Sequence, residues 1–222
     1  MAAPIEFETQ QLKEEVINMG TLVRTQLLKA RNAVVNYDAD LAREVFVKVR
    51  RVNAYELKID RDCANIFALR TPVAVDLRFV LAVLKINTNL ERIGDIAEGI
   101  AKHLLNTEKP FTKQLLKESK VLDMLDVSFS VLDDALAAFE NENTILARSI
   151  FQRDEFLDEI NLNATSFAMQ YMQEHPDETE QRLDSEAISR KRERIGDQTK
   201  NIAEEIIFYV EAKVLKHNND KS

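Results

Sequence analysis

Two copies of an acidic pentapeptide offer the clearest chemistry in this 222-residue chain. The sequence Glu-Arg-Ile-Gly-Asp occurs twice, and it contains Glu91 and Asp95 in one copy and Glu193 and Asp197 in the other. In a helix, residues four apart lie on one face, so each motif places two like charges side by side at a cost of about 0.2–0.5 kcal/mol. Each acidic pair therefore requires a cation or a hydrogen-bond donor beside it.

Two further acidic pairs have the same spacing. Glu56 precedes Asp60, and Asp154 precedes Asp158. Glu56 and Asp154 also occupy positions at which the helical repeat of apolar residues predicts a buried side chain. If the helices carrying these pairs pack antiparallel to the helices carrying the pentapeptides, four carboxylates converge on one patch in each half. Partly buried carboxylates without partners cost several kcal/mol each.

Two kinds of partner can neutralise such a patch. One is a set of salt bridges to Lys and Arg of neighbouring helices, which would leave a metal-free protein. The other is a metal ion held by hard oxygen ligands, which suit Mg, Mn and Fe, with Zn and Ni as further options. The repetition of the pattern favours metal binding in at least one half. The predicted ligands are Glu56, Asp60, Glu91, Asp95, Asp154, Asp158, Glu193 and Asp197.

The pentapeptides lie inside longer repeated segments. Residues 91–104 and 193–206 agree at seven of fourteen positions, and their offset of 102 residues is close to half of the chain. Such an offset indicates duplication of a half-length unit. We therefore predict two domains, residues 1–109 and residues 110–222. The glycine inside each motif costs about 1 kcal/mol relative to alanine in a helix, which indicates close helix packing or a direct role at the site.

Apolar residues spaced by three and four along most of the chain predict long amphipathic helices. The first is expected over residues 5–37, and Asp38 or Asp40 can cap the second. Thr71 followed by Pro72 predicts the start of a third helix, which carries the first pentapeptide.

The second half repeats this order. Thr112 can cap a fourth helix, a fifth follows a turn at residues 140–144, and His175-Pro176-Asp177 separates it from a sixth helix that should extend to about residue 217. No segment of the sequence shows sustained strand alternation, and four glycines are too few for the hairpins of a sheet protein. The prediction is an all-α fold of two tandem, pseudo-symmetric three-helix bundles.

Composition excludes several classes of function. The net charge is −8, so no overall positive field attracts nucleic acid, and we predict that none is bound. We interpret the basic cluster at residues 190–194 as a solvated helix face paired with nearby acids. The apolar runs are far shorter than the roughly 20 residues that span a bilayer, the lone Cys63 cannot form an internal disulfide, and the first residues lack a signal-peptide pattern. These features predict a cytoplasmic protein.

Several segments together resemble the PhoU family of phosphate-uptake regulators. They are Pro-Val-Ala-Val-Asp-Leu-Arg at residues 72–78, Leu-Glu-Arg-Ile-Gly-Asp at residues 90–95, the second pentapeptide, and Asn-Ile-Ala-Glu at residues 201–204. The stretch Val-Asn-Ala-Tyr-Glu at residues 52–56 also looks like the family's second helix. The resemblance covers most of the chain, in two halves.

The resemblance implies two three-helix bundles whose acidic patches carry multinuclear metal clusters, with iron as one occupant and the same eight carboxylates as ligands. It further implies negative regulation of phosphate import and of phosphate-starvation signalling. The implied partners are the ATPase of a phosphate ABC transporter and a membrane-bound sensor histidine kinase. We expect a homo-oligomer, such as a dimer, that meets the membrane only through these partners.

Two places depart from the family pattern. Asn89 stands where many members carry Asp, and Arg190-Lys191-Arg192 precedes the second motif where an apolar residue before Glu193 is usual. The second site is therefore expected to bind metal more weakly, or to use Arg190 as a counter-ion.

A carboxylate-bridged metalloenzyme is the competing class of function. Di-iron oxidases place a His three residues after a Glu, and none of His103, His175 and His217 follows an acidic residue at that spacing. The sequence also lacks phosphate-loop, nucleophile-elbow and His-Glu-x-x-His patterns. We therefore expect a non-enzymatic regulator, with the metalloenzyme and a metal-free helical adaptor as alternatives.

Overall fold

The computed structural model describes residues 5–162 and 164–215, with side chains for 5–153 and 169–215. The first half contains α1 (Ile5–Asn36), α2 (Ala39–Arg70) and α3 (Ala74–Asn106). The second half contains α4 (Lys113–Glu118), α5 (Val121–Asn141), α6 (Thr144–Leu162), α7 (Ala164–Glu174), a 3-10 turn η1 (Pro176–Glu178) and α8 (Thr179–Glu211). The described residues form no strand. The predicted all-α fold of two tandem three-helix bundles is confirmed, with α6 and α7 together taking the place of one helix.

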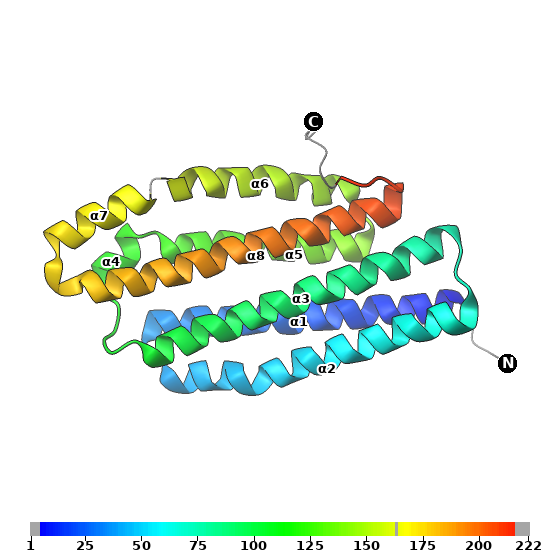
Figure 1. Ribbon diagram of the computed structural model, residues 1–222, viewed down its shortest axis with the longest axis horizontal. Helices are drawn as coiled ribbons and strands as arrows, with labels where there is room; N and C mark the ends of the chain where they lie inside the picture. Colours follow the sequence, from blue (N-terminus) through cyan, green and yellow to red (C-terminus); the bar gives the residue numbers. More distant parts are fainter. Residues whose placement is uncertain (1–4, 163, 216–222) are drawn as a thin grey trace.

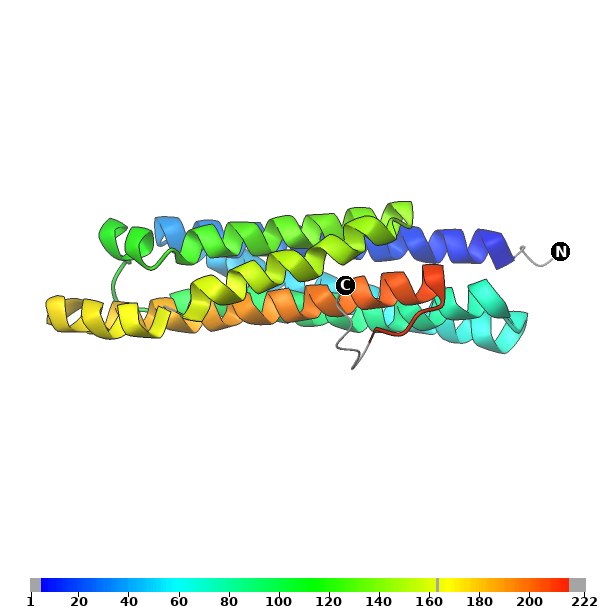
Figure 2. The same cartoon turned by 90° about the horizontal axis from the view of Figure 1, so that it is seen from above.

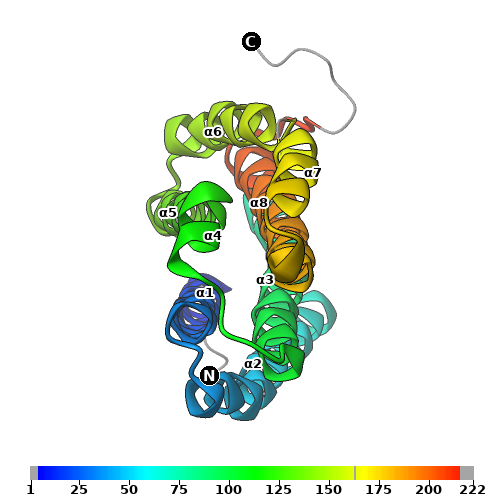
Figure 3. The ribbon, with the colours of Figure 1, turned by 90° about the vertical axis from the view of Figure 1, so that its left-hand side faces the viewer.

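The long helices run side by side along the longest dimension of the molecule (Figure 1). In the end-on view, α1 lies beside α5 and α3 lies beside α8, while α2 and α6 lie at opposite outer ends (Figure 3). The view from above shows the same pairing (Figure 2). The bundles therefore meet along two helix pairs. No helix in the described ranges combines the length and the apolar character needed to cross a bilayer.

Two of the predicted helix caps are confirmed. Asp38 Oδ1 accepts hydrogen bonds from the backbone N–H groups of Asp40 and Leu41, at 3.0 and 2.9 Å, where α2 begins. Thr112 Oγ1 accepts a hydrogen bond from the backbone N–H of Leu115 at 3.1 Å, where α4 begins. These side chains satisfy backbone donors that a first helical turn leaves without partners.

The predicted cap at Thr71 is wrong. Thr71 ends α2 in the left-handed region, with a φ of 49°. Val73 takes the capping position of α3 without a side-chain hydrogen bond, and α3 begins at Ala74. Because Pro72 disfavours right-handed helical geometry at the residue before it, Thr71 closes the preceding helix and does not open the next one.

The predicted fourth helix is divided, and the predicted sixth helix is shorter than expected. Lys120, with a φ of 52°, separates α4 from α5. Leu115 of α4 is fully buried, and the hydroxyl of Thr112 donates a hydrogen bond to Glu178 of η1 at 3.0 Å. These contacts fix α4 in place, so the chain must turn before α5. α8 stops short of residue 217 because Ala212 adopts a left-handed conformation, with a φ of 57°, and closes its last turn.

One hydrophobic core runs through both bundles. Where they meet, Phe79, Phe139 and Tyr209 form an aromatic cluster with ring centroids 5.5, 6.1 and 6.2 Å apart. A Cβ on Gly20 of α1 would lie 2.3 Å from Leu136 Cδ2 of α5, so these helices approach closely because residue 20 has no side chain. The division after residue 109 stays a prediction. The predicted apolar stripe of α1 is buried: Leu12, Val16, Met19, Val23, Leu27, Ala30 and Val34.

The contact between α3 and α8 repeats with the pseudo-two-fold relation of the bundles. Asn201 Nδ2 of α8 donates a hydrogen bond to Asn89 Oδ1 of α3 at 3.2 Å. The offset of 102 residues maps Asn89 onto Lys191 and Asn201 onto Gly99. These counterparts also meet, because a Cβ on Gly99 would lie 2.7 Å from Lys191 Nζ. One contact position therefore occurs twice, with different residues in it.

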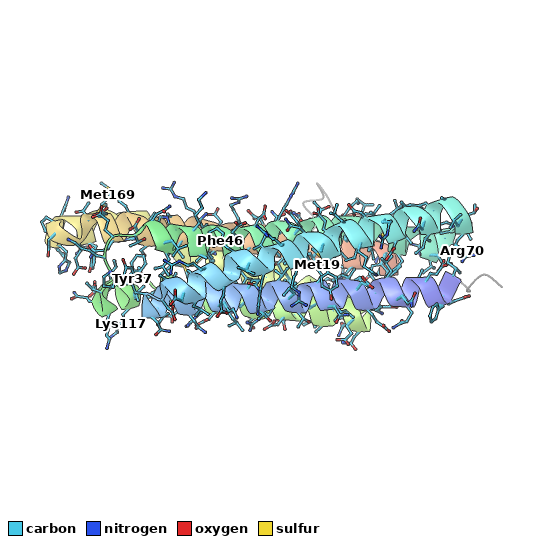
Figure 4. The ribbon with its side chains drawn as sticks, turned by 90° about the horizontal axis from the view of Figure 1, so that it is seen from below. Met19, Tyr37, Phe46, Arg70, Lys117 and Met169 are labelled. Atoms are coloured by element: carbon cyan, nitrogen blue, oxygen red, sulfur yellow. The ribbon has the colours of Figure 1, made fainter. Side chains whose placement is uncertain are left out.

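Polar contacts close the first bundle at both ends (Figure 4). Arg70, the last residue of α2, donates hydrogen bonds to both carboxylate oxygens of Glu8 in α1, at 2.6 and 2.8 Å. At the other end, the hydroxyl of Tyr37 donates a hydrogen bond to the carbonyl oxygen of Thr107 at 2.7 Å. The two contacts hold the ends of α2 and α3 close to α1, and Glu56, Asp60, Glu91 and Asp95 lie between these ends.

Candidate metal site

The four carboxylates of the first half come from two adjacent helices. Glu56 and Asp60 lie on α2, and Glu91 and Asp95 lie on α3. The two glutamates are half-buried and the two aspartates are exposed. These four residues are called the acidic patch below.

A close approach of α2 and α3 brings the two acidic pairs together. A Cβ on Gly94 would lie 3.1 Å from Val52 Cγ1, tighter than most contacts between a Cβ and a neighbouring atom. Val52 precedes Glu56 by one helical turn, and Gly94 lies within the pentapeptide. Of the two roles that the sequence left open for this glycine, the structure shows close helix packing, at the level of the acidic patch.

The two glutamates of the acidic patch have raised pKa values. Burial is the main cause that raises the pKa of Glu56 above its usual value, and the charges of Asp60 and Asp95 add to it. Burial raises the pKa of Glu91 to about 7, again with Asp95 and Glu56 contributing. The ionised forms of Glu56 and Glu91 are therefore destabilised, because burial and nearby like charges both favour the protonated form.

Asn87 is a member of this site that the sequence analysis missed. Its Nδ2 donates hydrogen bonds to the carbonyl oxygen of Glu56 at 3.0 Å and to Asp60 Oδ1 at 2.9 Å. Asn87 is fully buried, and its own Oδ1 has no hydrogen-bond partner. Asn87 lies one helical turn before Glu91, at a buried position of α3. A polar residue at such a position is the feature of the sequence that could have identified it. Asn87 joins α2 to α3 directly beneath the carboxylates.

The acidic patch fits a metal ion in the type of its donors and in its charge. Its four side chains offer only hard oxygen ligands. Among the side chains that the structure describes, no Lys or Arg forms an ion pair with any of the four. The geometry is less complete, because within residues 5–153 and 169–215 no three Asp, Glu, His or Cys side chains already converge closely enough to hold an ion. Metal binding here requires a closer approach of the carboxylates than the structure shows.

The second half differs at its corresponding positions. Glu193 and Asp197 of α8 are exposed, and Asp197 Oδ1 lies 3.3 Å from Lys200 Nζ. One acid of this pair therefore already has a cationic partner. The predicted ligands Asp154 and Asp158 lie on α6, and their side chains fall outside the described residues. Whether the four carboxylates of this half converge stays a prediction.

The interpretation of the basic cluster at residues 190–194 as a solvated face is wrong for two of its four cations, because Arg190 and Arg194 are exposed but Lys191 and Arg192 are not. Arg192 is almost fully buried, with 1% of its surface exposed, and Lys191 is half-buried against Gly99 of α3. Burial lowers the pKa of Lys191, and the charge of Arg194 lowers it further. The physical reason is that α8 packs against α3, α5 and α6, so little of its circumference is left for solvent.

Asn89, the other departure from the family pattern, has a structural role away from the acidic patch. It donates a hydrogen bond to the carbonyl oxygen of Lys85 at 2.7 Å and accepts the one from Asn201. Residues 89 and 91 point about 200° apart around a helix. The departure therefore affects the contact between the bundles.

Comparison with known proteins gives a consistent result. A family model described as the PhoU domain matches residues 16–104 and 121–206. The phosphate-specific transport system accessory protein PhoU of Edwardsiella tarda is 36% identical over 210 residues, which cover 95% of this chain and 86% of that protein. The protein of the same name from Escherichia coli (strain K12) is 33% identical with the same coverage.

Two solved structures share the fold. The crystal structure of PhoU from Pseudomonas aeruginosa matches with a TM-score of 0.85 and 31% identity, over 95% of this chain and 100% of that one. The structure of the phosphate transport system regulatory protein PhoU from Streptococcus pneumoniae matches with a TM-score of 0.83 and 27% identity, over 96% and 100% of the respective chains.

Proposed function

Because this chain belongs to the PhoU domain family, we propose that it restrains phosphate import and phosphate-starvation signalling as an accessory protein of a phosphate-specific transporter. Its partners in this proposal are the transporter's ATPase and a sensor histidine kinase. It acts in the cytoplasm as a homodimer and reaches the membrane through those partners. The names of the relatives, which describe accessory proteins of phosphate transport, support the transporter contact and a role without turnover.

The acidic patch is the proposed metal site. The observation that carries this part is that Glu91 lies close to other carboxylates and forms no ion pair with any Lys or Arg among the described side chains. Because the pKa of Glu91 is about 7, this carboxyl is protonated in a large fraction of the molecules at neutral pH. Glu91 would release that proton on binding a cation, so metal affinity should rise with pH through this range. A bound ion supplies positive charge that offsets the mutual repulsion of the four carboxylates and joins α2 to α3.

Each residue of the acidic patch has a distinct part in this proposal. Glu56 and Glu91, which are half-buried, would provide the fixed ligands. Asp60 and Asp95, which are exposed, would complete the site from the solvent side. The hydrogen bond from Asn87 holds the Asp60 carboxylate near α3. In the second half, Asp154, Asp158, Glu193 and Asp197 form the proposed weaker site, because Lys200 competes for Asp197.

Metal analysis of the purified protein tests the acidic patch. The variant Glu91→Gln plus Asp95→Asn should lose the metal of the first half, because it removes two of four charged ligands. The control Asp40→Asn plus Glu44→Gln removes an acidic pair of equal spacing on α2 that Arg43 and Lys29 already neutralise, and it should keep the metal. Wild-type protein that contains no metal, and whose melting temperature is unchanged by a chelator, would contradict the proposal.

A strain lacking this protein tests the regulatory role. Phosphate-starvation genes should be expressed in phosphate-rich medium, because the restraint on the kinase is gone. A reporter fused to a starvation-induced promoter measures this, and the chain supplied from a plasmid should restore repression. Unchanged reporter expression in the deletion strain would reject the regulatory role, whatever the metal content. An oxidase or hydrolase turnover that disappeared with the acidic-patch variant would instead favour the metalloenzyme.

A further inference from the structure

The first half of α8 passes the end of α3 (Figure 1). A pocket with a volume of about 420 Å³ is lined by residues of these two helices. Most of its lining comes from α8, and His103 is the contribution of α3. Three of the seven lining residues are Lys or Arg, although the whole chain has a net charge of −8. We call it the basic pocket; its lining is His103, Leu183, Glu186, Ala187, Arg190, Lys191 and Arg194.

The cations of the basic pocket, Arg190, Lys191 and Arg194, form no ion pair with any acid whose side chain the structure describes. Two acids lie close to the pocket: Asp184 Oδ1 lies 3.0 Å from His103 Nε2, and Oε2 of Glu186, which itself lines the pocket, lies 3.2 Å from Arg182 Nη2. Three clustered like charges repel one another, so an anion in the pocket would be stabilised by all three.

Lys191 lies in the contact between α8 and α3, where the two bundles meet. Its ammonium group rests on Gly99, where a Cβ would lie only 2.7 Å away. The two-fold related position in the first half holds the neutral hydrogen bond between Asn89 and Asn201. One turn from that contact, Lys85 Nζ is neutralised by both carboxylate oxygens of Glu205 at 3.0 Å. The first half therefore has a neutral pair at this position, whereas the second half has a lysine that forms no ion pair among the described residues.

We propose that the basic pocket binds a phosphate group, either as free orthophosphate or carried by a small organic molecule. Guanidinium groups bind phosphate oxygens with paired, charge-assisted hydrogen bonds, and an ammonium group adds a point charge. Arg190, Lys191 and Arg194 together suit a dianion. Leu183, which is 58% exposed, and Ala187 add an apolar wall that has room for an organic substituent. This site is separate from the acidic patch and does not depend on the regulatory role.

Isothermal titration at constant ionic strength, with a chelator present, tests the basic pocket. Wild-type protein should bind orthophosphate or AMP, and the variant Arg190→Gln plus Arg194→Gln should bind the same ligand at least tenfold more weakly. The matched control is Arg50→Gln plus Arg51→Gln, which removes the same charge from exposed residues of α2. Circular dichroism melting of each variant establishes that it is folded before the titration.

The ligands and one further variant distinguish the sources of binding. Binding of orthophosphate with equal or weaker binding of AMP identifies the free ion, and tighter binding of AMP identifies a phosphomonoester; both support the proposal. The acidic-patch variant Glu91→Gln plus Asp95→Asn should retain full affinity. In a parallel titration without the chelator, binding that is lost in this variant but kept in Arg190→Gln plus Arg194→Gln would place the phosphate on metal, and it would overturn the basic pocket. So would a wild-type protein that binds neither ligand.

Discussion

Replacing Phe139 by alanine should lower the free energy of unfolding by about 3–5 kcal/mol, because a fully buried aromatic ring leaves a cavity that its neighbours fill only in part. The Phe139 ring stacks on Phe79 at 6.2 Å between centroids and meets Tyr209 edge-on at 6.1 Å. The variant therefore removes packing from helices of both bundles. Urea denaturation followed by circular dichroism measures the change.

The matched control for this prediction is Phe7→Ala. Phe7 lies on α1 with 54% of its surface exposed, so its removal should change the unfolding free energy by less than about 0.5 kcal/mol. Since the aromatic cluster belongs to a core shared by the bundles, Phe139→Ala should shift one common transition. Two separate transitions, with only the second bundle destabilised, would contradict the shared core.

Replacing Glu91 by glutamine should stabilise the metal-free protein at pH 8 by about 1–3 kcal/mol, after allowance for solvent screening. The pKa of Glu91 is raised from an ordinary 4.5 to about 7 in the folded protein. Between these values the folded chain binds more protons than the unfolded chain, so the wild-type protein loses stability as the pH rises from about 4.5 to 7. Glutamine carries no charge and avoids this loss.

The pH dependence separates this effect from a general change in packing. The gain from Glu91→Gln should vanish below pH 4.5, where the wild-type carboxyl is protonated in both states. Glu44→Gln is the control with the opposite sign, because the hydrogen bond from Lys29 lowers the pKa of Glu44. That variant should lose stability at pH 8. Melting temperatures measured with a chelator from pH 4 to pH 8 give both curves, and a gain for Glu91→Gln that does not vary with pH would refute the electrostatic explanation.

Local sequence signals predicted most of the helices. The apolar stripe of α1 and the caps at Asp38 and Thr112 depend on nearest neighbours along the chain, and they are present in the structure. The error at Thr71 arose because Thr-Pro is compatible with a helix start and with a helix end, and the chain alone does not choose between them. Lys120 interrupts a continuous pattern because α4 packs on a distant segment.

The candidate site was predictable to a similar degree. Glu56 and Glu91 are half-buried, as their positions in the apolar stripes indicate, and the charge of Asp95 on α3 raises the pKa of Glu56 on α2. Convergence of all four carboxylates on one ion stays a prediction. The hydrogen bonds of Asn87 were not predictable, because they depend on the register between α2 and α3. The burial of Arg192 and Lys191 was also missed, since the sequence does not tell which neighbours surround α8. These residues owe their environment to contacts between helices far apart in the chain.

The paired contact between α3 and α8 has a consequence for how such a protein can change over time. In a symmetric dimer of identical half-length chains, both copies of that contact would have the same residues. Every substitution would therefore appear in both copies. Here the two copies belong to one polypeptide, and each of the four positions mutates independently. Asn89 and Asn201 form a neutral hydrogen bond, while at the other copy the ammonium group of Lys191 packs against Gly99. Because the halves are joined in one chain, the copy with Asn89 and Asn201 can keep a structural role while the copy with Gly99 and Lys191 is free to take part in ligand binding.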